Sequence, residues 1–139
     1  MVDLNYRPLS GLALSAKAGK YADTAAVHLW ELPKRRMITL RIDPADTALV
    51  AKAEAALGMS LPTKPNTLSA YTSDSYVLWM SPDEFMIDMA FAGPDGADAA
   101  TLQALTDAMA GAFALVADVS DQMAGVGLGG KAWREVWSK

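Results

Sequence analysis

The amino-acid sequence predicts an α+β fold in which helices pack against a mixed or antiparallel sheet. Residues 38–42 and 85–90 alternate side chains of different character, which is the period of a half-buried strand. Residues 45–57 and 98–112 instead place alanine, leucine and methionine at helical spacing. A chain of 139 residues, 52% of them hydrophobic, is long and apolar enough to bury a core of its own.

The first quarter of the chain predicts an arm followed by two strands. Residues 1–25 are rich in Gly, Ala, Ser and Lys and lack periodicity, so we expect an arm that orders only against another surface. Residues 26–139 are predicted to form a single domain, with its first strands at 27–32 and 37–42. The basic run Lys34-Arg35-Arg36 between them is interpreted as a solvated hairpin loop, with an anion or partner contact as the alternative.

Asp43-Pro44 predicts the start of the first helix, because an aspartate side chain accepts a backbone N–H and proline suits the first helical position. Gly58 predicts its end, since glycine readily adopts the left-handed cap conformation. Two prolines, Pro62 and Pro65, then indicate an extended connector outside regular pairing.

The segment from Leu78 to Phe85 predicts a hairpin. It joins an apolar strand, residues 76–80, to the alternating strand that follows, and residues 68–72 form a further strand before it. Pro82 sets the backbone angle of a tight turn, and the preceding serine offers a side-chain acceptor. Strand 76–80 is apolar on both faces and is therefore placed inside the sheet.

The remaining elements are a helix capped by Asp98, strands at 114–119 and 123–128, and a short helix from Lys131. Residues 37–53 and 123–139 share the order strand, turn, helix. We therefore expect one complete unit followed by the start of a second, truncated one. Such an arrangement leaves apolar surface for another chain, or for a homodimer when the protein is isolated.

Composition excludes several classes of function. The net charge is −4 and no basic stripe exists, so nucleic-acid binding is not expected. Cysteine is absent, which rules out disulfides and thiol chemistry, and His28 is the single histidine, so no metal site is expected. No apolar run reaches the roughly 20 residues of a membrane span, and lysines interrupt residues 12–20, unlike a signal peptide. A cytoplasmic protein is predicted.

No catalytic constellation emerges from the remaining motifs. Residues 125–130 fit the G-x-G-x-x-G pattern of dinucleotide sites, but only nine residues follow, so a flexible, closely packed strand end is favoured. The carboxylate pairs Asp83 with Glu84 and Asp118 with Asp121 are interpreted as turn residues rather than acid–base pairs. We therefore assign no catalytic residue and no metal ligand.

Two tryptophans indicate a partner surface. Trp133 and Trp137 are four residues apart on the last helix and so share one of its faces. Little chain follows to bury them. Trp79 and Trp30 are interpreted as core or interface aromatics, and His28, beside Trp30, as structural or exposed.

The order of motifs resembles the gamma subunit of heterotetrameric sarcosine oxidase. The most specific pair is Leu57-Gly58 with Leu61-Pro62, followed by Leu78-Trp79 with Pro82-Asp83-Glu84-Phe85. The remaining matches cover nearly the whole chain: Arg7-Pro8-Leu9, Leu40-Arg41-Ile42-Asp43-Pro44, Ala56-Leu57-Gly58-Met59-Ser60, Thr63-Lys64-Pro65-Asn66-Thr67, Val116-Ala117-Asp118-Val119-Ser120-Asp121 and Leu128-Gly129-Gly130-Lys131-Ala132-Trp133-Arg134-Glu135-Val136.

The resemblance implies a fold like the folate-binding domain of glycine-cleavage T-proteins. It also implies a complex that oxidatively demethylates sarcosine to glycine, passing the one-carbon unit to tetrahydrofolate or releasing formaldehyde, with hydrogen peroxide formed. The expected partners are the alpha, beta and delta subunits. FAD, FMN and NAD are expected on alpha and beta and zinc on delta, whereas the gamma subunit has no established catalytic residue and is expected to bind no cofactor. Family members continue through a second half of the fold, so the resemblance leads us to expect a truncated second half in this chain.

Two alternatives remain open. A free-standing folate or pterin binder of the same fold would use Trp79 as a stacking surface and Glu84 as a ring-nitrogen partner. A directly catalytic demethylase would use Asp118 or Asp121. The leading hypothesis is a non-catalytic gamma subunit that stabilises assembly.

Overall fold

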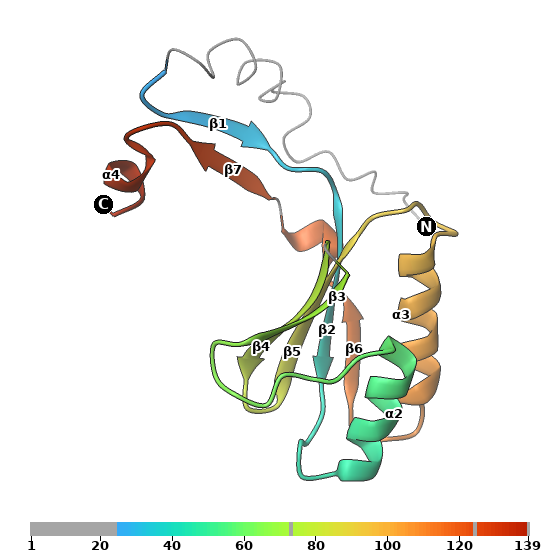
Figure 1. Cartoon of the computed structure of the whole chain (residues 1–139). Coiled ribbons are helices and arrows are strands. Elements are labelled where there is room, and N and C mark those ends of the chain that lie inside the picture. Colours follow the sequence, from blue (N-terminus) through green and yellow to red (C-terminus); the bar gives the residue numbers. More distant parts are fainter. Residues whose placement is uncertain (1–24, 73, 124, 139) are drawn as a thin grey trace. The chain divides into compact units, whose positions relative to one another are not determined.

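The computed structural model describes residues 25–72, 74–123 and 125–138 (Figure 1). The arm predicted for residues 1–25 lies, apart from its last residue, outside the described residues. The chain divides into two compact units, a larger one spanning residues 35–120 and a smaller one formed by the segments up to Lys34 and from Asp121 onward. Each unit is described by itself.

The larger unit is a five-stranded antiparallel sheet with two helices, which confirms the predicted α+β class. The strand order is β3-β4-β5-β2-β6, and every neighbouring pair is antiparallel. Its elements are β2 (Arg35–Arg41), α2 (Thr47–Leu57), β3 (Leu68–Thr72), β4 (Ser75–Ser81), β5 (Glu84–Ala90), α3 (Ala97–Ala108) and β6 (Leu115–Asp118). A short 3₁₀ turn follows at Ser120–Gln122.

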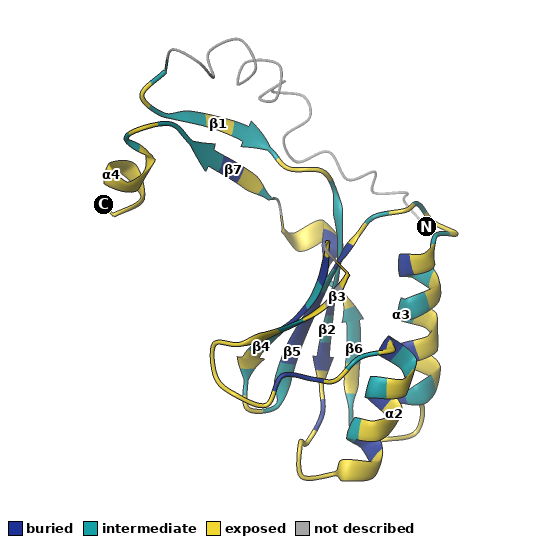
Figure 2. Cartoon of the chain, in the orientation of Figure 1, coloured by how far each residue is buried: buried dark blue, intermediate teal, exposed yellow. Residues whose placement is uncertain are grey.

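The core lies between α2 and α3 and one face of this sheet (Figures 1 and 2). Alternate strand residues point into it, so β2 contributes Ile38 and Leu40 while their neighbours face the other way. The helices contribute Leu49, Ala53 and Leu105, which are all nearly inaccessible to solvent. Hydrophobic burial on this one face therefore fixes the register of the strands.

The hairpin predicted for residues 78–85 is confirmed. β4 ends at Ser81 and β5 begins at Glu84, so Pro82 and Asp83 form the turn. The pairing shifts between Trp79 and Ser81, which marks a bulge next to the turn. As predicted, β4 lies inside the sheet, between β3 and β5.

The predicted start of the first helix is displaced by three residues. Asp43 accepts the Ala45 N–H at 2.8 Å and so shapes a turn before the helix. The cap is Asp46, whose side chain accepts the Leu49 N–H at 3.0 Å. Both aspartates offer the same chemistry, and the one nearer the apolar stripe begins the helix. The predicted end is confirmed, because Gly58 is left-handed with φ of 69°.

Two local predictions were wrong, and one interaction explains both. Arg36 belongs to β2 rather than to a solvated loop, and Asp98 lies within α3, whose cap is Gly96. The Asp98 side chain is 1% exposed and accepts a hydrogen bond of 3.0 Å from Arg36 Nε. Arg36 also donates to Asp118 on β6. A buried arginine with two carboxylate partners thus links the helix to β2 and to the edge strand β6.

The smaller unit is a two-stranded antiparallel ribbon followed by a short helix: β1 (His28–Glu31), β7 (Val126–Gly129) and α4 (Trp133–Trp137). Trp30 is opposite Gly127 and His28 is opposite Gly129. The two rings stack, with centroids 5.3 Å apart. A Cβ at Gly127 would overlap the Trp30 ring, and one at Gly129 would lie 2.8 Å from His28 Nε2. These glycines therefore make room for aromatic side chains, as the close-packing interpretation predicts.

Gly127→Ala is expected to destabilise the ribbon by about 1 to 3 kcal/mol, because the added methyl group forces Trp30 from its position. Near-ultraviolet circular dichroism should report the loss of the ordered Trp30–His28 stack. Val126→Ala, at a neighbouring position that is 45% exposed, serves as the control and should leave the spectrum unchanged. An unchanged spectrum for Gly127→Ala would contradict the packing described.

Asp98→Ala is expected to lower the free energy of unfolding by about 2 to 3 kcal/mol, because it leaves the largely buried Arg36 with one partner fewer. The measurement is urea denaturation. Asp107→Ala removes an exposed aspartate from the same helix and should cost less than about 0.5 kcal/mol. Equal losses for the two variants would show that the Arg36 link contributes nothing specific.

Candidate functional site

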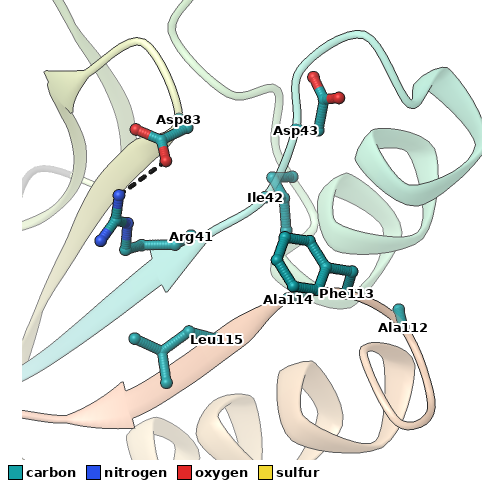
Figure 3. A pocket seen from close by; sticks show the side chains of 8 residues that line it. All are labelled: Arg41, Ile42, Asp43, Asp83, Ala112, Phe113, Ala114 and Leu115. Atoms are coloured by element: carbon teal, nitrogen blue, oxygen red, sulfur yellow. Dashed lines mark hydrogen bonds and ion pairs between the residues drawn. The ribbon is translucent and has the colours of Figure 1, made fainter.

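A cavity of the larger unit lies at one end of its sheet (Figure 3). Its volume is about 560 Å³, and it is open to solvent. The lining residues come from the end of β2, the β4–β5 turn and the loop between α3 and β6: Arg41, Ile42, Asp43, Asp83, Ala112, Phe113, Ala114 and Leu115. Phe113 is fully exposed, and Leu115 is 49% exposed. The walls are thus mainly apolar, with three charged groups at the rim.

The charged groups of this cavity already have partners. Arg41 donates to the Asp83 carboxylate at 2.8 Å, and the Ser81 hydroxyl donates to its other oxygen at 2.9 Å. The hydrogen bonds from Arg41 and then Ser81 hold the pKa of Asp83 below its ordinary value. Asp43 accepts the Ala45 N–H. An ionised, paired carboxylate at an exposed rim is a poor general base.

Asp118 and Asp121, the predicted catalytic alternative, are held in separate ion pairs. Asp118 accepts hydrogen bonds from Arg36 and from both the N–H and the hydroxyl of Ser120. Asp121 lies 3.3 Å from Lys34 Nζ. Burial favours a raised pKa for Asp118, but the Ser120 and Arg36 contacts outweigh it and lower the pKa.

Trp79 and Glu84, the predicted folate contacts, lie on opposite faces of the sheet. Trp79 pairs with Phe85 and packs against the helix-covered core. Glu84 is the residue before Phe85 and pairs with Arg41, so its side chain is on the other face. The structure therefore does not bring these two side chains together in one site.

The described residues do not form a recognisable site for a metal ion or for a pyrophosphate group. Within residues 25–72, 74–123 and 125–138, no three histidine, aspartate or glutamate side chains gather as ligands for a metal ion. Gly127 and Gly129 lie against the Trp30 and His28 rings, which occupy the space that side chains at these positions would take. Also among these residues, no helix has the length and apolarity required to cross a bilayer.

Trp133 and Trp137 lie on an exposed helix (Figure 2). Trp137 is 78% exposed and Trp133 is 37% exposed. Other large apolar side chains of the smaller unit are also exposed: Leu29, Leu32, Met123, Val126 and Val136. The two tryptophans predicted to form a partner surface are thus exposed, together with other apolar side chains of this unit.

Comparison with known proteins places the chain in a family. Residues 41–139 match the family model described as "Sarcosine oxidase, gamma subunit family". This chain belongs to that family. The gamma-family assignment covers α2, the hairpin at 78–85 and the closing Trp133–Trp137 helix, and it confirms the resemblance seen in the sequence motifs.

Two individual relatives come from one bacterium. The gamma-family chain is 34% identical over 84 residues to the sarcosine oxidase subunit gamma of Corynebacterium sp. (strain U-96), a match that spans 60% of this chain and 40% of the relative. It also resembles a chain in the solved structure of heterotetrameric sarcosine oxidase from Corynebacterium sp. U-96 in complex with pyrrole 2-carboxylate. That match has a TM-score of 0.63 and 28% identity, and it covers 83% of this chain and 60% of the other.

The sequence analysis predicted neither the buried ion pair of Arg36 nor the position of Phe113 in the cavity wall. Arg36 lies in a run of three basic residues, which resembles a solvated loop, and its partner Asp98 is 62 residues away. Phe113 has a weak local signal: it is a single aromatic residue among alanines, two positions after Gly111.

The stability of the gamma-family chain is expected to fall in acid through its buried carboxylates. Burial raises the pKa of Asp98, but the bonds from Arg36 and the Ala92 N–H outweigh it, so the net shift is downward. The unfolded chain therefore binds protons first as the pH falls. The stabilisation is complete above the unfolded pKa of aspartate and is lost as the pH falls through that value towards the lower folded pKa. Asp98→Asn should flatten this part of the curve of unfolding free energy against pH; an unchanged slope would contradict the assignment.

Proposed function

We propose that this chain is a non-catalytic gamma subunit of a heterotetrameric sarcosine oxidase complex, which demethylates sarcosine oxidatively to glycine. Family membership supports the proposal, as does the structural similarity to a chain of the heterotetrameric enzyme from Corynebacterium. The assigned role is to stabilise assembly with the alpha, beta and delta subunits. The proposed location is the cytoplasm.

The observation that carries the assembly role is the exposed apolar surface of the smaller unit. A two-stranded ribbon has little independent stability in water, and a single turn of helix adds little. Here Leu29 is 50% exposed, Val136 is 55% exposed and Trp137 is 78% exposed. Large aromatic side chains are the usual anchors of protein interfaces. A partner that covers them would supply the burial that this unit lacks.

The polar groups of the described residues support a role without chemistry. Asp83, Asp98 and Asp118 are each bound to an arginine, and their pKa values are lowered. A general base or acid at neutral pH needs a pKa shifted towards neutrality. These carboxylates are shifted in the opposite direction, which suits structural ion pairs.

The cofactors of the proposed complex belong to its other subunits. FAD, FMN and NAD are assigned to alpha and beta, and tetrahydrofolate is the expected acceptor of the one-carbon unit. The residues described here do not fit these groups: the glycine-rich segment is filled by aromatic rings, and Trp79 and Glu84 are on opposite faces of the sheet. No step of the reaction is therefore assigned to this chain.

When a tagged form of this chain is expressed with the alpha, beta and delta subunits of the same organism, the four polypeptides are expected to co-purify in equal amounts. Trp137→Ala should weaken the association by about 10-fold, since an exposed aromatic anchor is lost. Lys52→Ala, at an exposed position of α2, is the control and should bind like the unaltered chain. A chain that elutes alone, with the other three subunits assembled without it, would refute the proposal.

A further inference from the structure

The second face of the five-stranded sheet is apolar at its centre, and neither helix of residues 35–120 packs against it. A cross-strand row runs over this face from β3 to β6. Leu68 is opposite Leu78, Leu78 is opposite Met86, Met86 is opposite Thr39, and Thr39 is opposite Ala117. We call the surface around this row the open sheet face.

The side chains of this face are distinct from the core that the helices cover. Met86 is 8% exposed, yet it is not part of the core cluster that includes its neighbours Phe85 and Ile87. At the margins of the face, Leu68 is 55% exposed and Leu115 is 49% exposed. An apolar surface of this kind on a sheet normally packs against a second layer.

Ion pairs border the open sheet face at both ends. At one end Arg35 contacts Asp88 at 2.8 Å and Asp74 at 2.7 Å. At the other end Arg41 contacts Asp83 and lies opposite Glu84. Each end thus has more carboxylates than guanidinium groups and carries a net negative charge. An apolar centre with a charged rim is the usual composition of a protein interface.

We propose that the open sheet face docks an apolar patch bordered by lysine or arginine on another subunit of the oxidase complex. The inference rests on the proposed function and adds a second contact surface to that of the smaller unit. The negative charge of the rim argues against a second copy of this chain as the binding partner. In a face-to-face dimer either end would meet another end of net negative charge, whereas a basic border complements both.

The test uses a charge placed at the β3 end of the apolar row, at the exposed margin of the face. Leu68→Glu puts a carboxylate at an exposed site of the edge strand β3, and Ala104→Glu puts the same group at an exposed site of α3. Affinity for the purified alpha–beta–delta assembly is measured by biolayer interferometry. Leu68→Glu should weaken binding by about 10-fold or more, since it buries an unpaired charge, and Ala104→Glu should bind like the unaltered chain.

The charge of the rim is tested separately. Asp74→Lys reverses a carboxylate that is 66% exposed. It should slow association by about 3-fold or more at low salt, with the difference decreasing as salt is added, because rim charges act mainly on the encounter rate. Unchanged association would overturn the basic character assigned to the partner.

Four results would overturn the proposed docking. Equal binding by Leu68→Glu and the unaltered chain would show that the partner docks elsewhere, while leaving the proposed function intact. A free chain that sediments as a dimer, and as a monomer after Leu68→Glu, would identify a second copy as the occupant. A loss of thermal stability in free Leu68→Glu, absent from Ala104→Glu, would show that the chain covers this face itself. Failure of the unaltered chain to bind refutes the proposed function as well.

Discussion

The structure of the larger unit depends on the alternation of β2. This strand lies inside the sheet, between β5 and β6, so its side chains must satisfy two different environments. Ile38 and Leu40 enter the core beneath the helices, and Arg36 on the same side binds Asp98 of α3 and Asp118 of β6. If the register of β2 shifted by one residue, Ile38 and Leu40 would turn to the opposite face of the sheet and a neighbouring arginine of the strand would turn into the core. Register, helix placement and the edge strand are therefore fixed together.

The residues of β2 that face away from the core bear on the proposed function. Thr39 and its neighbours across the sheet form an apolar row that no helix of residues 35–120 covers, and the smaller unit exposes Trp133 and Trp137. Several charged side chains of the larger unit are paired with one another, among them Arg36 with Asp98 and Arg41 with Asp83. Exposed apolar surface of this kind is suited to contact other proteins. This agrees with membership in the sarcosine oxidase gamma subunit family.

Local sequence signals predicted much of the fold and little of its long-range chemistry. The 78–85 hairpin and the Gly58 cap depend on neighbouring residues, and both were predicted correctly. The helix start was displaced because Asp43 and Asp46 offer the same cap. The link from Arg36 to Asp98 joins residues 62 positions apart, so no periodicity reveals it. Of the candidate site, the exposure of the two terminal tryptophans agrees with their spacing, but the open sheet face required the register of five strands.

The central claim is that partner subunits complete the smaller unit. Hydrogen–deuterium exchange of the free chain and of the assembled complex tests it most directly. The ribbon and α4 have few backbone partners of their own, so their amides should exchange rapidly in the free chain. In the complex, amides within residues 126–137 should slow by about 10-fold or more, while those of α2 should change little. Identical exchange of residues 126–137 in the two samples would contradict the account.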